Sequence, residues 1–595
     1  MNSVKAMFRS PFVVILWVIV AWFALTLLIV PNVNLLVETF APSGQRNAFE
    51  KLLSSDRAIR SLWNSVILAV ALTVTVNVLG IFIVLVTRYF RVVGAKFLYL
   101  CYATTFIYGG IVLVSAYSYV YGGSGLLARF AEGLPLIGTD FTGFWAVLFV
   151  MTFSCTTNHL LFMSSAVQKL DQQTIDSARM MGAGQWYTLR RVVLPQLRPS
   201  IFATSILTFL TGLGAFSAPI LVGGRDFQTI SPMILAFANT QTSRDIAALL
   251  ALILGLMTMV LLVVMNRLER GGTYFSIARV ATPLKKVRIA HPVGNALLHV
   301  VAYAVAAVYL FPVLVAVGFA FMPSQMVNNG EFSITAVTLE NFVRVFTASD
   351  ALRPLLVSVA YGAATSLTLV IGLVFVTRYL QKFDNWVTRI TEYLLHIPWI
   401  LPSTMIALGL LVTYDQPKPL LFGAVLSGTV VILFVAYVVT KIPFTLRMLK
   451  AAFSGVNTSM EEAAQLMGAS TLTVFRRILL PAVLPVASAI TALNFSGTLD
   501  DYDIAVFLAH PRFQPLGLTI AANTGSETNL AAQSNSFVYT VVLMVISGLT
   551  MWLVYERLLA PKKPRSPRQV SAAKPERKAA AQAARPTTRV DEALP

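Results

Sequence analysis

A polar segment of 26 residues occurs twice in this chain, 286 positions apart, each time between long apolar runs. In each copy a carboxylate and two small residues are followed, after three positions, by a glycine. The residues are Asp176, Ser177, Ala178 and Gly182 in the first copy, and Glu462, Ala463, Ala464 and Gly468 in the second. Such residues can form a helix, a turn and a docking surface, so the chemistry we expect from them is recognition and mechanical coupling.

The second copy shows which local structure the spacing predicts. Residues 463–467 are good helix formers, and two glutamates precede them, where carboxylates favour the positive end of the helix dipole. Gly468 suits the helix end, because glycine enters the left-handed conformation without steric cost. We expect a second helix over 471–480, and we expect Pro481 and Pro485 to break it and redirect the chain. A partner could grip this shape, and the shape could pass a displacement to the next span.

The chain lacks the sequence patterns of ATP-hydrolysing and metal-dependent sites. It has no G-x-x-x-x-G-K-[ST] pattern and no Gly-Lys dipeptide, so the lysine that holds nucleotide phosphates is missing. Neither H-E-x-x-H nor C-x-x-C spacing is present, and the two cysteines, Cys101 and Cys155, fall within apolar runs. We therefore predict no catalytic residue, no metal site, no cofactor and no enzymatic activity in this chain.

Composition predicts an integral membrane protein. Hydrophobic residues make up 56% of the chain and charged residues 12%, against about 25% charged residues in soluble domains, and the mean hydropathy is +0.73. A helix needs roughly 20 apolar residues to cross the hydrocarbon core. Twelve such runs occur, near 12–30, 61–87, 97–121, 142–167, 200–222, 246–266, 296–322, 354–377, 387–413, 420–440, 486–508 and 537–556. They are continuous rather than alternating, which predicts an all-α protein with about twelve transmembrane helices.

The distribution of charge predicts the orientation. If the N-terminus is cytoplasmic and the chain crosses twelve times, the inner segments hold 34 Lys and Arg against 11 Asp and Glu, and the outer segments 11 against 15. An excess of Lys and Arg marks the cytoplasmic side of membrane proteins. We therefore expect a multi-pass membrane protein with both termini cytoplasmic. The pI near 10.0 then reflects topology, and we expect no nucleic-acid binding.

The duplication divides the chain into two halves. Val86–Tyr89 recurs as Val376–Tyr379, 290 positions later, and six spans per half give parallel repeats. The expected parts are a first half over 1–266 with its loop at 168–199, a cytoplasmic linker over 267–295, a second half over 296–559 with its loop at 454–485, and a tail over 560–595. The tail is rich in Pro, Ala and basic residues, so we expect it to be disordered in the cytoplasm.

The two loops resemble the cytoplasmic EAA loop of bacterial binding-protein-dependent ABC-importer permeases, although the first copy has Asp-Ser-Ala in place of Glu-Ala-Ala. The resemblance implies two six-helix repeats of the type I permease kind, in the bacterial inner membrane. It also implies that the eight loop residues named above couple the chain to ATPase subunits. The implied partners are two copies of an ATPase subunit, which bind ATP and Mg, an external solute-binding protein and membrane lipid. One copy of this chain would serve each transporter.

The two halves differ just after the repeated loop. Residues 212–219 are uncharged, whereas the matching positions of the second half include Asp500, Asp501 and Asp503. Three acids near the outer end of a span are costly unless they face water, a cation or a partner. They could form an outer gate, a substrate vestibule, a docking site or a solvated turn, and the sequence leaves these alternatives open.

The fused two-half layout resembles the branch of permeases that import ferric iron, polyamines, thiamine or phosphonates. Residues 500–508 resemble ferric-iron permeases, so ferric iron is the substrate we expect first, with a sugar phosphate, phosphonate, polyamine or thiamine as alternatives. A self-sufficient 6+6 secondary transporter would carry coupling acids inside its spans, and these are nearly absent here. A channel would not need duplicated coupling loops. Both are weaker alternatives.

Cysteine accessibility tests the orientation. Single cysteines at positions 184, 275 and 470 of a cysteine-free variant should resist a membrane-impermeant thiol reagent in intact cells, because these positions are expected inside. They should react once the membrane is permeabilised, whereas a cysteine at position 335 should react in both cases. Labelling of position 184 or 470 in intact cells would contradict the orientation.

Overall fold

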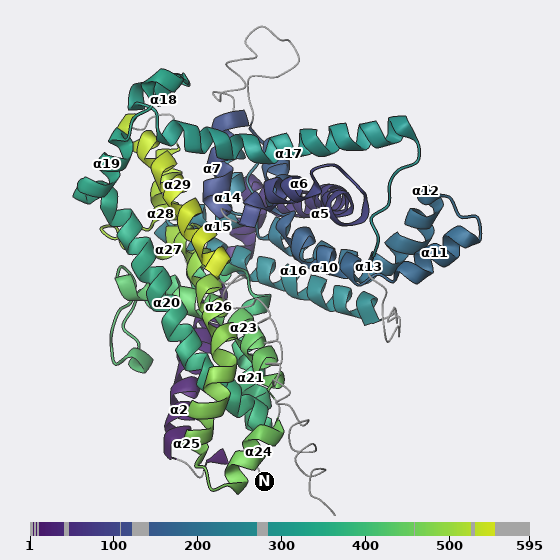
Figure 1. Cartoon of the computed structure of the whole chain (residues 1–595). Coiled ribbons are helices and arrows are strands. Elements are labelled where there is room, and N and C mark those ends of the chain that lie inside the picture. The colour runs from purple at the N-terminus through teal and green to yellow at the C-terminus, as the bar shows by residue number, and fades with distance from the viewer. Residues whose placement is uncertain are drawn as a thin grey trace, which may run out of the picture.

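The computed structural model of the chain describes residues 4, 7–8, 11–40, 47–106, 109–121, 142–270, 284–456, 458–524 and 530–553. Within these residues the secondary structure is helical apart from one isolated bridge between Phe90 and Val287. The all-α class predicted from the apolar runs is therefore confirmed. Figure 1 shows two groups of long helices that diverge from a common centre. The expected tail lies outside the described residues.

The described helices of the first half lie, in chain order, at α2 (Pro11–Phe23), η1 (Ala24–Ile29), α3 (Val30–Phe40), α4 (Ala48–Leu53), α5 (Asp56–Val84), η2 (Leu85–Tyr89), α6 (Ala95–Tyr102), η3 (Ala103–Phe106), α7 (Gly110–Tyr121), α9 (Phe144–Ser154), η4 (His159–Met163), α10 (Ser164–Gln168), α11 (Gln172–Met180), α12 (Gln185–Thr188), η5 (Leu189–Val193), α13 (Leu194–Leu213), α14 (Ser217–Val222), α15 (Ile230–Ala238), η6 (Gln241–Ser243) and α16 (Arg244–Arg270).

Those of the second half lie at α17 (Pro292–Ala320), α18 (Ser324–Asn329), η7 (Ile334–Ala336), α19 (Glu340–Thr347), α20 (Ser349–Lys382), α21 (Trp386–Ile400), α22 (Ser403–Thr413), η8 (Pro419–Leu421), α23 (Val430–Ser454), α24 (Thr458–Leu466), α25 (Thr471–Val474), η9 (Phe475–Leu479), α26 (Leu480–Leu499), α27 (Ala505–Leu508), α28 (Leu516–Asn523) and α29 (Leu530–Trp552).

The helices agree with the expected number of membrane spans. Ten of those described are long and apolar enough to cross a membrane, and two bent pairs bring the number to twelve if each pair forms one span. The bent pairs correspond to the third and ninth expected spans. In the ninth, α21 and α22 meet at an angle of 106°. This helix is therefore broken inside the protein rather than straight.

Several expected spans have boundaries that differ from the prediction: the first, expected at 12–30, continues to Phe40, and the fifth, expected at 200–222, ends at Leu213. The tenth, expected at 420–440, begins only at Val430, because the residues before it turn at Gly423 and Gly428, both with positive φ. The eleventh, expected at 486–508, ends at Leu499, and its helix already begins within the repeated loop. Apolar composition alone did not separate helix from turn in these segments.

The prolines that follow each repeated loop do not break the helix, so the predicted bend is wrong. A π-helical turn, η9, precedes α26, and the Leu480 N–H donates to the carbonyl of Phe475, five residues back. Pro481 lies in the first turn of α26, and Pro485 lies inside it. The wider π turn relieves the clash that a proline ring makes with a regular helical turn. The first half repeats this arrangement through η5 and α13.

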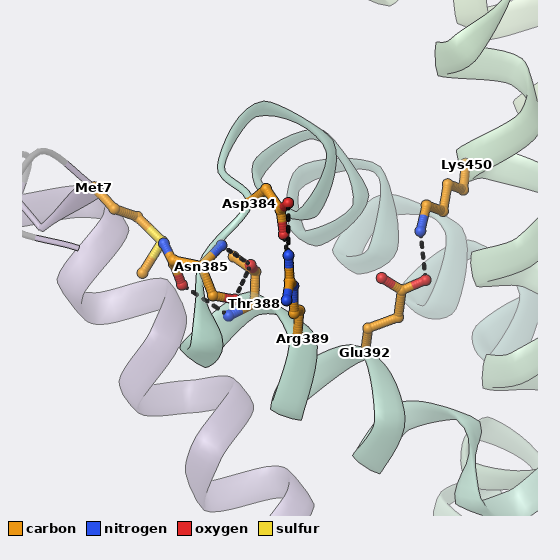
Figure 2. A network of polar contacts seen from close by, with 7 residues as sticks. All are labelled: Met7, Asp384, Asn385, Thr388, Arg389, Glu392 and Lys450. Atoms are coloured by element: carbon orange, nitrogen blue, oxygen red, sulfur yellow. Dashed lines mark hydrogen bonds and ion pairs between the residues drawn. The ribbon is translucent and has the colours of Figure 1, made fainter. Parts of the chain in front are cut away.

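The first span of each half packs against the other half. The segment before α2 reaches the second half, where the Asn385 Nδ2 donates to the Met7 Sδ at 3.6 Å, as Figure 2 shows. In the opposite direction, α17 lies against α6, and the Tyr102 hydroxyl donates to the Ala302 carbonyl at 2.8 Å. The two repeats are therefore contiguous in sequence and interlocked in space.

Candidate functional site

Both repeated loops contain the predicted helix followed by a turn at glycine. Gly182 and Gly468 have the same φ of +83°. In each loop the glycine N–H donates to the carbonyl three residues back at 2.9 Å. The next N–H donates to the carbonyl five residues back, at 3.1 Å to Ala178 and at 3.0 Å to Ala464. This Schellman pattern satisfies the last carbonyls of α11 and α24, and it confirms the glycine turn in both copies.

The loop residues divide between a buried and an exposed face. Ala178 and Ala464 are buried. Exposed positions on the same two helices are Asp176, Ser177, Glu462 and Ala463. At the tips, Met181 and Met467 are each 83% exposed, which is unusual for large apolar side chains. A polar loop with an apolar tip has the character of a docking surface that another protein covers.

The two loops lie far apart in the molecule. In Figure 1, α11 and α12 end one group of helices, and α24 and α25 end the other. Two partners of the same kind could therefore bind without sharing a surface. The end of each helix group that carries a loop is called the loop end of that half.

The linker holds the first loop in place. The Gln172 side chain, at the start of α11, accepts the Lys285 N–H at 2.9 Å. Gln185, at the start of α12, accepts the Ala290 N–H at 3.0 Å and donates to the Arg288 carbonyl at 2.7 Å. Residues 285–290 thus bind both helices of the first loop.

An ion pair holds the second loop in place. Arg378, near the end of α20, binds Glu461 in the first turn of α24. The two side chains are only 14% and 13% exposed, so little water screens the pair. Sequence analysis singled out the neighbouring Glu462, which is exposed. The helical position of Glu461, on the same face as the buried Ala464 three residues later, could have identified the inward carboxylate.

The two halves touch each other at equivalent residues. Helices α13 and α26 end at Leu213 and Leu499, 286 positions apart. Just beyond, the Ser217 hydroxyl donates to the Asp503 carboxylate, and these two residues are also 286 positions apart. The rings of Phe216 and Tyr502, again one repeat apart, have centroids separated by 5.7 Å. Residues related by a repeat can meet only near the axis that relates the halves, so this contact marks the centre of the molecule.

A cavity of about 440 Å³ lies beside this contact. The first half contributes residues of α7, α9, α13, α14 and α16 to its walls, and the second half contributes residues 399–403 and Asp503. Asp503 is the one charged side chain among the described lining residues. The volume of the cavity falls within the roughly 300–1,000 Å³ that is usual for small-ligand pockets. The cavity lies beside the end of α13 and beside the break between α21 and α22.

The three acids that follow α26 all belong to this central region. Asp500 accepts the Gly109 N–H at 3.3 Å, and Asp501 accepts the N–H groups of Ile504 and Ala505, each at 3.3 Å. All three acids are half-buried, counting Asp503 on the cavity wall. The structure thus brings them together between the halves, and their role as a gate or vestibule stays a prediction.

Sequence analysis missed a lysine close to these acids. Lys441 lies inside α23, and its Nζ donates to the Gly497 carbonyl at 2.9 Å near the end of α26. It was overlooked because the tenth span was drawn to end at residue 440. At the 286-residue offset, Lys441 corresponds to Cys155 of the first half, which lies in the fourth span and lines the cavity. This correspondence could have shown that Lys441 also lies within a span. A lysine within a span is costly and typically functional.

Two interlocked six-span repeats, a cavity on their shared axis and two exposed loops define a membrane permease that receives its energy from other subunits. The chain belongs to the family of binding-protein-dependent transport system inner membrane components, whose model matches residues 110–271 and again 368–563.

Similar proteins share this class. The chain is 35% identical over 560 residues to the probable ABC transporter permease protein y4fN of Sinorhizobium fredii, covering 92% of this chain and 97% of that protein. It is 23% identical over 438 residues to the Fe(3+)-transport system permease protein FbpB 2 of Haemophilus influenzae, with 72% and 80% covered. It is 28% identical over 196 residues to the spermidine/putrescine transport system permease protein PotC of the same species, with 32% and 73% covered.

This protein is therefore the permease subunit of an ABC importer and a multi-pass protein of the inner membrane. The two family matches confirm a fused chain with two permease halves. They also exclude the self-sufficient carrier and the channel. Membership in this family implies an ATPase and an external binding protein as partners.

Valine at Gly182 or Gly468 should impair transport while the protein still inserts in the membrane. No atom lies within 4 Å of a Cβ added at either position, so the cost comes from the backbone. Positive φ costs about 1–2 kcal/mol for a residue with a side chain. The turn should open and displace the apolar tip, and uptake in cells that express the whole transporter should fall severalfold.

Gly184→Val is a matched control for this experiment. This glycine lies in the same loop, has an ordinary φ of −64° and has open space around its Cβ position. Uptake should stay near wild type, and immunoblots of membranes should show equal amounts of all variants. Normal uptake in both Gly182→Val and Gly468→Val would refute a coupling role for the turns.

Proposed function

We propose that this chain forms the passage for ferric iron in an ATP-driven importer, and that the central cavity is part of that passage. The observation that carries the proposal is Asp503, the charged group on the cavity wall, at the contact between the two halves. Carboxylates lining a membrane pathway attract cations and repel anions. Similarity to a protein named for Fe(3+) transport supports the same substrate.

The cavity has the character of a passage rather than a storage site. Among the described residues no group of three or more His, Cys, Asp or Glu side chains is arranged to hold a metal ion. A cation that meets one carboxylate binds weakly enough to leave, which conduction requires. Ferric iron would enter as the substrate, delivered by the external binding protein.

A polyamine is the second candidate substrate. The similarity to PotC, named for spermidine and putrescine transport, covers 196 residues. A polyamine is also cationic, so the same Asp503 carboxylate would favour it. The two candidates differ in what they require, because a polyamine chain would also need apolar contacts along the cavity, which Val114, Val150 and Trp399 offer.

The two repeated loops would each dock one ATPase subunit, so that one copy of this chain works with two ATPase copies. Both loops present an exposed apolar tip behind the same glycine turn, which supports two sites of one kind. ATP and Mg would be bound by those subunits. This arrangement places both loop ends and both termini in the cytoplasm, in agreement with the positive charge of the expected inner segments.

Replacing Asp500, Asp501 and Asp503 together by Asn should lower uptake about tenfold while ATPase subunits still assemble. The reason is the loss of attraction for the cation and of a charged hydrogen bond, whose strength is about 1.5–3 kcal/mol. Uptake is measured in proteoliposomes that contain the permease, its ATPase and its solute-binding protein. Parallel assays with labelled ferric iron and labelled spermidine identify the substrate.

Raising the ionic strength should weaken wild-type uptake more than uptake by this variant, because salt screens the acids over about 8–10 Å. The single variant Asp415→Asn, which removes an acid paired with Arg244 away from the cavity, serves as a control. Wild-type rates in the triple variant would remove the acids from the pathway.

A basic pocket at the end opposite the loops offers a site where the binding protein could dock. This cavity of about 550 Å³ is lined by Arg57, Arg60, Arg225 and Asp226, all exposed. No described carboxylate forms an ion pair with these arginines. The Asn64 Nδ2 fixes the neighbouring turn by donating to the carbonyl of residue 228 at 3.0 Å. The pocket therefore presents net positive charge to an acidic protein surface.

Replacing Arg57, Arg60 and Arg225 together by Gln should raise the concentration of binding protein at half-maximal uptake about tenfold. Three exposed ion pairs, at roughly 0.2–1 kcal/mol each, amount to that factor. Maximal uptake should be unchanged, because the arginines lie outside the central cavity. A titration of binding protein in proteoliposomes measures both quantities, and a fall in maximal uptake alone would argue against docking.

A further inference from the structure

A larger cavity, of about 650 Å³, lies at the loop end of the second half. Its walls come from α2, α20, α25 and η9. Three aromatic rings form one wall. The ring centroids of Phe12 and Phe375 are 5.8 Å apart, and those of the stacked rings of Phe375 and Phe475 are 5.3 Å apart. Phe12 and Leu472 are 51% and 65% exposed, so the cavity borders the outer, apolar surface of the helices. Lipid covers such a surface in a membrane.

Two cations lie at one end of this apolar wall. Arg378 and Lys382 are one helical turn apart in α20, and both line the cavity. Arg378 already binds Glu461 of the second loop. Lys382 is exposed, and in the described part of the chain no carboxylate forms an ion pair with it. The cavity thus combines an apolar wall with net positive charge, so it suits a ligand that is both apolar and anionic.

In the described part of the first half, the residues at the corresponding place are different. Val92 corresponds to Lys382 at the offset of 290 positions that relates Val86–Tyr89 to Val376–Tyr379. Ile175 corresponds to Glu461 at the offset of 286 positions that relates the two loops. Val287 of the linker covers this region, because its backbone exchanges hydrogen bonds with residues 89 and 91 at 2.9 and 2.8 Å. The described residues beside the two loops therefore differ, and the open cationic cavity described above lies beside the second loop.

We propose that this cavity binds an anionic phospholipid, with its phosphate at Lys382 and Arg378 and an acyl chain along Phe12, Phe375 and Phe475. The volume falls within the range of ligand pockets, and basic residues at the membrane surface attract anionic lipids. Arginine is suited to share its planar donors between a phosphate and the Glu461 carboxylate. The proposal rests on the proposed function only in naming the cytoplasmic leaflet as the source of the lipid.

The bound lipid would join three elements that otherwise meet through few polar contacts. Figure 2 shows that the segment before α2 is held to α21 by Asn385, close to this cavity, which Met7 also lines. A lipid between α2, α20 and α24 would stiffen the second loop through Arg378 and Glu461. The first loop, which the linker holds, would not respond to the lipid.

Binding is measured on the full chain in detergent, by native mass spectrometry with added dioleoyl phosphatidylglycerol or dioleoyl phosphatidylcholine. Wild type should retain the phosphatidylglycerol preferentially. Lys382→Gln should lower its affinity about fivefold, the effect of one basic residue near an anionic surface. The matched control Lys96→Gln, which removes an exposed lysine at the loop end of the first half, should change neither lipid.

Two further measurements distinguish binding of the whole lipid from binding of its headgroup alone and from attraction by the general surface charge. Leu472→Trp narrows the cavity without altering charge and should also lower phosphatidylglycerol retention. Glycerophosphoglycerol, the headgroup without chains, should not displace the lipid at equal concentration. Equal retention of both lipids by wild type, or equal losses in Lys382→Gln and Lys96→Gln, would overturn the proposal. Displacement by the headgroup alone would reduce the site to a phosphate site and overturn it too.

Hydrogen exchange of the full chain in liposomes tests the consequence for the loop. Amides of α24 should exchange severalfold more slowly in phosphatidylglycerol than in phosphatidylcholine, whereas amides of α11 should exchange equally in both. Equal exchange of α24 in the two lipids would contradict stiffening of the second loop. None of these measurements involves transport, so their failure and a failure of the proposed passage are distinguishable.

Discussion

Backbone groups inside a membrane must find partners within the protein, and this constraint decides where the chain can open a cavity. The helices are interrupted beside the axis that relates the two halves, where the acids that follow α26 supply partners for free backbone groups. Asp500 serves the N–H of Gly109 across the interface, and Asp501 serves the two N–H groups that begin α27. Elsewhere the spans are mainly helical, and π turns such as η5 and η9 keep their backbone hydrogen bonds within the helix. The interface between the repeats is therefore both the place of weakest secondary structure and the place where a solute can pass.

The duplication kept backbone geometry and changed side chains. Both glycine turns have the same φ and the same hydrogen bonds, and both helices that follow begin with a π turn before proline. The side chains that fasten the loops have diverged, to glutamines that bind the linker in the first half and to an ion pair in the second. At the axis, a serine faces an aspartate. The halves thus share one mechanical design but present different charges and surfaces.

Several features could be predicted because they follow from local chemistry. The glycine turns follow from helix formers ahead of Gly182 and Gly468, and the membrane class follows from continuous apolar runs. The effect of Pro481 was misjudged, because the π turn that accommodates it is formed by the five residues Phe475–Leu479 ahead of it rather than by the proline itself. Lys441 was missed because apolar residues of the turn before α23 displaced the expected span by about half its length. These errors come from competition between neighbouring segments, which composition does not resolve.

The central contact and the exchange of first spans were beyond sequence reasoning for another reason. A repeat reveals which residues are equivalent, such as Ser217 and Asp503, but not which equivalent residues lie near the axis. Likewise, nothing in the apolar pattern of α2 indicates whether it packs on its own half or on the other. Both features depend on which helices, distant in sequence, pack together. Because all the helix surfaces are apolar, their composition does not indicate the partner.

The exchange of first spans also sets an order of events during synthesis. Met7, just before α2, and its hydrogen-bond partner Asn385 are 378 positions apart. At about 5–20 residues per second, the ribosome needs about 20 to 75 seconds to make the residues between them. During that interval α2 must remain in the bilayer without its partners in the second half. By contrast, α17 emerges after α6 has been made and can pack at once. The contact between α2 and the second half therefore forms late, when the second half captures the helix that was inserted first.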